Sequence, residues 1–299
     1  MSFNIEVLGG KSYLLPTGGK YCPQDIAIAA IGGGFEIAIT NNADGTQSLA
    51  ITDSSGAKID VSKVVSALSY NGDAMKLLYD LPPIGTTLQN ATWSQISGAS
   101  KAEKAQNYWS VGDTKSVAIG GVTYTVEIIG FSHDTLADGS GKAGITFAMK
   151  DCLNATYQMN TANTNAGGWG GSALRNTLQG TIFNQLPADM RMAIRAVNKK
   201  ASAGSQSTTI NEYPDTLFLL SEIEVFGENT YCVPGEGAQY SIFADSTSRI
   251  KKMNGAATNW WLRSPFKSNS AYFGRVNYMG SADGLGANGA NAVAFAFCV

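Results

Sequence analysis

The stretch WWLRSPFKSNSAYFGRVNYMGSADGLGANGANAVAFAFCV, residues 260–299, decides how the C-terminal part of the chain folds. Its glycines permit sharp turns at places where a β-carbon would clash. Because neighbouring residues on a strand face opposite ways, at least one of the Trp260 and Trp261 rings is expected in the core. Apolar residues spaced as inward-facing anchors recur through the rest of the stretch: Phe273, Val276, Val293, Phe295 and Phe297.

The residues between these anchors are rich in Tyr, Ser, Asn and Gly, as antibody binding surfaces are. Tyr272, Arg275 and Tyr278 are of the types that most often anchor interfaces. A plain surface loop has a similar Gly-, Asn- and Ser-rich composition and is the alternative. The predicted ligand-binding residues are Phe266, Lys267, Ser268, Asn269, Ser270, Tyr272, Arg275, Asn277, Tyr278, Ser281, Asp283 and Asn288.

Upstream of this stretch, the pattern from residue 108 onward is that of one larger domain. Short strands alternate with two helical segments, which predicts an α+β fold. The glycine pair Gly120–Gly121 predicts the turn of a β-hairpin over residues 116–130. The other expected elements are strands at 144–149 and 216–220 and helices at 172–178 and 186–197.

The first third of the chain divides into two further parts. Residues 1–60 read as short strands separated by glycine-rich turns, and predict a small β-rich attachment domain. Residues 61–107 have helical spacing and a Thr or Ser suited to capping at the start of 92–107, and predict a helical connector. The length of 299 residues suits this division into domains at 1–60, 61–107 and 108–299.

Composition excludes several classes of partner. The net charge of −2 argues against nucleic acid and anionic membranes. No apolar run of about 18 residues predicts a membrane span, and the N-terminus lacks the pattern of a signal peptide. The four cysteines (Cys22, Cys152, Cys232 and Cys298) lie too far apart for a zinc motif and are expected to be free and buried, so no metal or cofactor is predicted.

A resemblance to a known family rests on motifs spread along the later part of the chain. They are YWSVGD at 108–113, EIIGFSHD at 127–134, GGW at 167–169, EVFG at 224–227 and, as the most specific, WWLRSP at 260–265. Over residues 92–299 the chain resembles DUF6273-type domains of gut bacteria and their phages. These look like relatives of the C-type lectin fold in the variable proteins of diversity-generating retroelements. Separately, LPTGGKYC at 15–22 resembles a segment near the N-termini of phage tail and baseplate-associated proteins.

The resemblance implies a C-type-lectin-like domain that binds a host cell-surface protein or glycan through a diversified C-terminal segment. The N-terminal part would attach to other tail or baseplate proteins, in a virion or at a cell surface, and the protein would form a homotrimer. A structural tail or surface-decoration subunit is the alternative. An oxidase like the formylglycine-generating enzymes ranks lower, because it needs a close cysteine pair for copper and Cys232 and Cys298 lack the motif. The single histidine, His133, stands beside Asp134; a base-and-orienter pair is conceivable there, and a structural role is the simpler interpretation. We therefore do not predict an enzyme.

Overall fold

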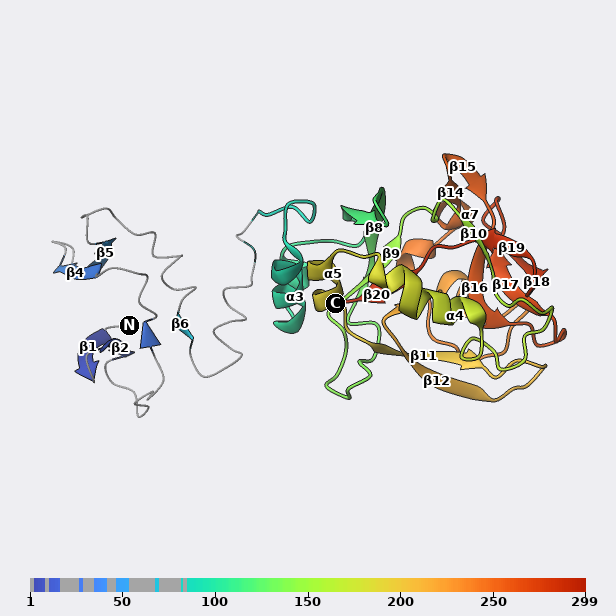
Figure 1. The fold of residues 1–299 in the computed structure, drawn as a ribbon, viewed down its shortest axis with the longest axis horizontal. Helices are drawn as coiled ribbons and strands as arrows, with labels where there is room; N and C mark the ends of the chain where they lie inside the picture. The colour runs from blue at the N-terminus through green and yellow to red at the C-terminus, as the bar shows by residue number, and fades with distance from the viewer. Residues whose placement is uncertain are drawn as a thin grey trace. The chain divides into compact units, whose positions relative to one another are not determined.

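The computed structural model describes six strands within the first 81 residues, then Pro82 and residues 85–299. The chain forms two compact units, Met1–Leu81 and Pro82–Val299. Figure 1 shows the elements of each unit. None of the helices among the described residues is long and apolar enough to cross a membrane.

The described part of the N-terminal unit consists of three antiparallel strand pairs. Four of the strands match the sequence-based expectation for residues 1–60 closely. Within the helical connector expected over 61–107, residues 61–67 and 70–81 lie outside the described residues, and Leu68–Ser69 form a short strand where a helix was expected. The pairs are β1 (Phe3–Leu8) with β2 (Lys11–Pro16), β4 (Phe35–Asn41) with β5 (Gln47–Asp53), and β3 (Ala27–Ile28) with β6 (Leu68–Ser69).

The first helix of the C-terminal unit, α3 (Trp93–Lys101), begins with a capping box in which Thr92 and Gln95 bond each other's backbone N–H groups. A capping Thr or Ser was expected here, and Thr92 is the residue that caps the helix. The Trp93 ring packs edge-on against Phe147, 5.7 Å between ring centroids. The helix assigned from the sequence to a connector is thus packed within the C-terminal unit. The short helix η1 (Ala105–Asn107) follows it.

A five-stranded sheet forms one layer of this unit, in the order β13-β20-β9-β8-β7. The predicted hairpin is confirmed: Gly120 and Gly121 have φ of 56° and 83°, which is the left-handed backbone that a tight hairpin turn needs. The strand nearest the C-terminus, β20, lies between β13 and β9, inside this sheet. The strands are β7 (Thr114–Ile119), β8 (Val122–Phe131), β9 (Ile145–Met149), β13 (Leu217–Phe218) and β20 (Ala296–Cys298).

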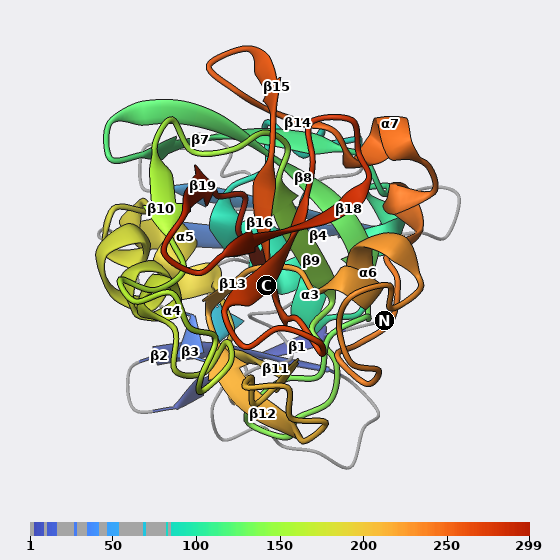
Figure 2. The same cartoon turned by 90° about the vertical axis from the view of Figure 1, so that its right-hand side faces the viewer.

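A second five-stranded sheet, in the order β10-β19-β16-β17-β18, is built largely from the stretch that decides the fold. Figure 2 views the unit from the side on which β16 and β18 lie. Every residue of β16 is buried, including both tryptophans of the motif. The strands are β10 (Thr156–Gln158), β16 (Trp260–Pro265), β17 (Tyr272–Val276), β18 (Ala282–Gly286) and β19 (Ala290–Ala292).

Short helices and two hairpins complete the unit. The helix predicted over 172–178 is α4 (Ala173–Thr177), capped by Ser172 and continued by the π-helix η2 (Leu178–Ile182). The helix predicted over 186–197 is shorter, because α5 ends at Ala193 and the chain turns into a strand. The remaining elements are β11 (Val197–Ser202), β12 (Ile210–Asp215), α6 (Glu222–Phe226), η3 (Ser241–Phe243), α7 (Ser246–Arg249), β14 (Lys251–Met253) and β15 (Ala256–Thr258), with α5 itself at Ala188–Ala193.

The core confirms the predicted anchors. The five apolar anchors of residues 273–297 are each fully buried, and Trp260 and Trp261 are buried as well. Trp169 is buried, with its ring N–H donating to Asp215 at 2.7 Å. Helices and strands together confirm an α+β domain.

Candidate functional site

The arginine of the WWLRSP motif is a buried structural hub. The Arg263 guanidinium bonds both carboxylate oxygens of Glu224, at 2.5 and 2.9 Å. It also donates to the backbone carbonyls of Leu219, Lys200 and Glu236, at 2.6 to 2.9 Å. Burial alone would lower the pKa of Arg263, but Glu224 raises it. The prediction that Arg263 is an ion-pair and backbone-bonding residue is confirmed, and the ion pair fixes α6 against β16.

A second buried cation extends this network toward the surface. Lys199 Nζ lies 2.6 Å from Asp134 Oδ1 and 2.6 Å from Glu224 Oε1. Asp134 Oδ2 accepts hydrogen bonds from Thr146 and Tyr240, both at 2.6 Å. Burial would raise the pKa of Asp134, yet the Lys199 ammonium, together with the His133 and Thr146 side chains, holds it well below its usual value. Two cations therefore balance two carboxylates, as buried charges require.

Glu236 differs from the other two carboxyl groups of this network, because its pKa is raised and theirs are lowered. Its Oε1 accepts the Ser202 backbone N–H at 2.7 Å, and the Ser264 hydroxyl donates to Oε2. Burial raises the pKa of Glu236 to about 7, against the opposing pull of Arg263 and these hydrogen bonds. Near neutral pH this carboxyl group is therefore partly protonated.

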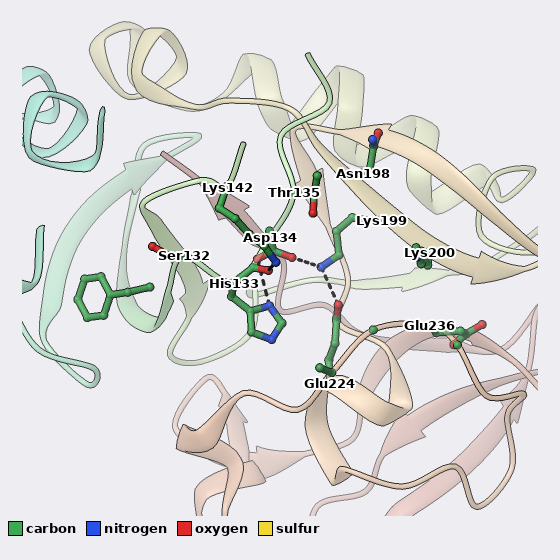
Figure 3. A pocket seen from close by; sticks show the side chains of 14 residues that line it. Ser132, His133, Asp134, Thr135, Lys142, Asn198, Lys199, Lys200, Glu224 and Glu236 are labelled. Carbon is green, nitrogen blue, oxygen red and sulfur yellow. Dashed lines mark hydrogen bonds and ion pairs between the residues drawn. The ribbon is translucent and has the colours of Figure 1, made fainter. Parts of the chain in front are cut away.

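A cavity of about 460 Å³ opens above the network (Figure 3). In the sequence, Asp134 stood out only as the neighbour of His133. Lys142 and Glu236 did not stand out, because these residues come together only in the folded chain. The lining residues are Phe131, Ser132, His133, Asp134, Thr135, Lys142, Asn198, Lys199, Lys200, Glu224, Gly235, Glu236, Gly237 and Ala238.

The imidazole of His133 lacks a hydrogen-bond partner in this cavity, and the dashed line to Asp134 in Figure 3 marks an ion-pair contact that forms when the ring is protonated. Its ring stacks on Tyr240, with 3.9 Å between centroids. Its Nδ1 lies 3.6 Å from Asp134 Oδ2, beyond hydrogen-bond distance. Among the described residues neither ring nitrogen has a hydrogen-bond partner. Because Asp134 bonds Lys199, Thr146 and Tyr240 instead, it does not hold the imidazole as the orienting member of a catalytic pair would.

The predicted binding residues of segment 266–291 occupy the second sheet and its loops. Phe266 is buried beneath an aromatic stack: its ring is parallel to that of Tyr231, 4.8 Å away, and lies 5.8 Å from that of Tyr272. Tyr231 and Tyr272 are 36% and 37% exposed. We call Tyr231, Phe266 and Tyr272 the aromatic cluster. No pattern in the sequence pointed to Tyr231, which lies outside the segment.

The structure does not bring Tyr272 and Arg275 onto one face. They stand three positions apart on β17, whose pairing with β18 has no bulge, so their side chains project from opposite faces. Arg275 is half-buried and pairs with Asp283 on β18 at 2.6 Å. Arg275 and Asp283 therefore bond each other across the strands.

The turn after β17 displays the most exposed apolar side chains of the segment. Tyr278 and Met279 are 57% and 59% exposed. Asn277 Oδ1 accepts the backbone N–H groups of Met279 and Ser281, at 2.9 and 3.0 Å. Gly280 has φ +80°, and a β-carbon there would lie 1.9 Å from the Ser246 carbonyl oxygen. We call residues 277–281 the tip; Met279, which sequence reasoning did not select, belongs to it.

The remaining predicted residues are exposed, and one loop among them has a fixed backbone. The buried Asn165 donates to the carbonyls of Asn269 and Tyr272, at 2.9 and 2.8 Å. Loop residues 267–270 thus stand at a defined place beside the aromatic cluster. The exposed residues are Lys267, Ser268, Asn269, Ser270, Ser281 and Asn288.

Three cysteines, Cys152, Cys232 and Cys298, are free and buried as predicted, and Cys22 lies outside the described residues. Burial raises the pKa of the Cys152 thiol to about 12 and those of Cys232 and Cys298 well above the usual value. These thiols are therefore protonated and poor nucleophiles. No group of three or more His, Cys, Asp or Glu side chains in the described part of the chain could hold a metal ion.

A family model described as a domain of unknown function, DUF6273, matches residues 143–299. The chain belongs to the DUF6273 family. The expected resemblance over 92–299 is thereby confirmed from residue 143 onward. The DUF6273 match contains Lys199, Glu224 and Arg263, whereas His133 and Asp134 precede it although they belong to the same compact unit. No curated protein and no solved structure matches the chain.

Proposed function

We propose that this protein is a receptor-binding protein whose DUF6273 domain presents a ligand-binding surface on segment 266–291. The tip carries the proposal. Tyr278 and Met279 project from a turn whose backbone is held by Asn277 and by the close approach of Gly280 to Ser246. A turn already fixed in one conformation loses little entropy on binding, so more of the contact energy remains as affinity.

The aromatic cluster supports the same proposal at the other end of β17. Tyr272 begins the strand and Tyr278 follows its end, six residues later, which corresponds to about 20 Å of extended chain. Tyr231 and Tyr272 offer rigid rings with few rotatable bonds, the side-chain type favoured in adaptable binding surfaces. The segment thus presents exposed aromatic groups at both ends of one strand.

The scaffold beneath supports a display role as well. The apolar anchors of the segment and the Arg263–Glu224 pair are buried, whereas the residues proposed to bind lie on loops or strand faces. We propose that this scaffold is C-type-lectin-like. Its support is the return of β20, the last described strand, to pair with β9 inside the first five-stranded sheet.

The sequence resemblances extend the proposal to the place where the protein acts and the proteins it assembles with. The N-terminal unit would attach the protein to phage tail or baseplate proteins, the display domain would face a host cell-surface protein or glycan, and the chain would assemble as a trimer. If the segment is diversified, the source genome should contain a reverse transcriptase gene. It should also contain a near-identical copy of the terminal coding sequence that differs from it mainly at adenines. A genome without both would remove diversification while leaving binding untouched.

The test of binding uses fluorescently labelled full-length protein and a panel of intact gut bacterial cells, read by flow cytometry. We expect binding to at least one strain, and a loss of at least about tenfold in apparent affinity in the double variant Tyr278→Ser, Met279→Ser, as for an interface hot spot. Met192→Ser is the matched control, because Met192 is 82% exposed on α5 and outside the segment. A second variant, Tyr231→Ala with Tyr272→Ala, measures the aromatic cluster separately.

Unfolding curves in urea confirm that each variant is folded before binding is compared. Equal binding by the wild-type protein and both double variants would show that segment 266–291 is not the contact surface. Failure of the wild-type protein to bind any strain of the panel would count against a receptor-binding role. Loss in only one double variant would assign the contact to that end of β17.

A further inference from the structure

The cavity above the buried charge network is built from a different part of the chain. All of its lining residues lie between positions 131 and 238, outside segment 266–291. Its volume of about 460 Å³ falls within the range of roughly 300 to 1,000 Å³ that is usual for small-molecule sites. The cavity is therefore a second candidate site, sized for a small molecule.

His133 gives the first chemical requirement for an occupant. Buried polar atoms are almost always hydrogen-bonded, so an unpaired one calls for a missing partner such as a ligand. Both ring nitrogens of His133 are buried and lack a partner among the described residues, although the side chain as a whole is 22% exposed. A neutral imidazole has one donor and one acceptor nitrogen. The matching occupant carries hydroxyl groups, which both donate and accept, and the partly buried ring has to turn on its stack for its nitrogens to meet them.

Lys142 gives the second requirement. Its ammonium group donates one hydrogen bond, to the His133 carbonyl at 2.7 Å, and no other bond to the described residues is shown for it. Two N–H groups therefore remain for an occupant beside the imidazole (Figure 3). Lys199, by contrast, is bound to both Asp134 and Glu224.

The charges around the cavity favour an anion. Three lysines line it against three carboxyl groups, of which Glu236 is partly protonated near neutral pH, and Arg263 lies directly behind Glu224. Lys200 pairs with Glu212 at 3.3 Å, and Asp134 and Glu224 balance Lys199 and Arg263. Lys142 is the cation that has no carboxylate partner among the described residues.

The wall is also fixed before any ligand arrives. Ser132 has φ 48°, an unusual conformation for a residue other than glycine, and such strain gathers at ligand sites. Gly237, with φ +134°, lies so close to Glu224 that a β-carbon would stand 2.8 Å from Oε1. The loop of residues 235–238 consequently sits tightly on the buried network, and the cavity keeps its shape.

We propose that this cavity binds a small hydroxylated carboxylate, of the chemical class of a hexuronic acid. The carboxylate would pair with the Lys142 ammonium, and ring hydroxyls would satisfy the two nitrogens of His133. This site is independent of the surface on segment 266–291, so either site can exist without the other.

The test exploits the fact that His133 is the chain's single histidine. In untagged, ¹⁵N-labelled full-length protein its imidazole nitrogens give an unambiguous NMR signal, titrated with D-glucuronate. We expect a saturable shift with a dissociation constant in the millimolar range, and at least about tenfold weaker binding of D-glucose, which lacks the carboxylate. Absence of a saturable shift, or equal binding of the two sugars, would overturn the proposal.

Calorimetric titrations of variants with glucuronate assign the contacts. Lys142→Ala and His133→Phe should each weaken binding at least about tenfold; the phenyl ring keeps the stack on Tyr240 while it removes both nitrogens. Lys252→Ala is the matched control, because Lys252 is an exposed lysine that does not line this cavity. Lys142 is exposed, so its variant is expected to fold, and unchanged binding in it would refute the site. Titration with the β-methyl glycoside of glucuronate distinguishes the two sources of the ligand. If the glycoside binds, the ligand is an acid carried on a glycan. If only the free sugar binds, the ligand is a free acid.

Discussion

Replacing Glu236 by Gln tests the buried network directly. Folding raises the pKa of this carboxyl group from 4.5 to about 7, because burial disfavours its charged form. Between these two pH values the folded state therefore holds more protons than the unfolded state, and stability falls as pH rises. At about 1.4 kcal/mol for each pKa unit, ionised Glu236 destabilises the folded protein by about 3 kcal/mol above pH 7 relative to pH 4.5.

The glutamine side chain of the Glu236→Gln variant cannot ionise, and its amide can still accept from the Ser202 N–H and bond the Ser264 hydroxyl. We expect the free energy of unfolding of Glu236→Gln minus that of the wild-type protein to rise by about 3 kcal/mol between pH 4.5 and pH 7.5. The contributions of other ionisable groups, such as Asp134, cancel in this difference.

The assay is urea unfolding followed by tryptophan fluorescence. All five tryptophans lie between residues 93 and 261, so the signal reports the C-terminal unit. Glu212→Gln, at an exposed position on β12, serves as the matched control for the loss of a carboxylate. A difference for Glu236→Gln that stays constant across this range would refute the assignment of a raised pKa to Glu236.

Two further substitutions test the scaffold by their effect on the free energy of unfolding in urea. Arg263→Met should destabilise the C-terminal unit by about 3 to 5 kcal/mol, because it leaves Glu224 buried beside only one cation; a loss below about 1 kcal/mol would contradict the central role of Arg263. Gly280→Ala should cost about 2 kcal/mol or more, because the new β-carbon meets the Ser246 carbonyl in a left-handed turn, whereas Gly255→Ala, with open space around it, should cost clearly less.

Local signals in the sequence predicted much of the secondary structure. The hairpin turn at Gly120–Gly121 and a capping Thr or Ser at the start of 92–107 depend on residues a few positions apart, and both are confirmed. The apolar anchors of residues 273–297 were also correct, and three of them, Val293, Phe295 and Phe297, have the alternate spacing of one buried face. The extent of the helix over 186–197 was wrong: residue 197 begins β11, which pairs with β12, and this pairing outweighs helical spacing.

Contacts between residues far apart in the sequence could not be predicted from it. Arg263 was recognised as structural, yet its partner Glu224 lies 39 positions away, and neither its identity nor that of Lys199 followed from any pattern. The predicted binding residues Tyr272 and Arg275 project from opposite faces of one strand, a distinction that depends on the register of β17. The cavity around His133 combines side chains from separate segments of the chain, so no local motif could indicate it.

The position of β20 has a genetic consequence. This strand lies between β13 and β9, inside its sheet, and it comes after segment 266–291 in the chain. A stop codon or a shift of reading frame anywhere in that segment therefore deletes an interior strand of the scaffold. A product shortened or frame-shifted in that segment lacks the sequence of β20, so we expect it not to fold.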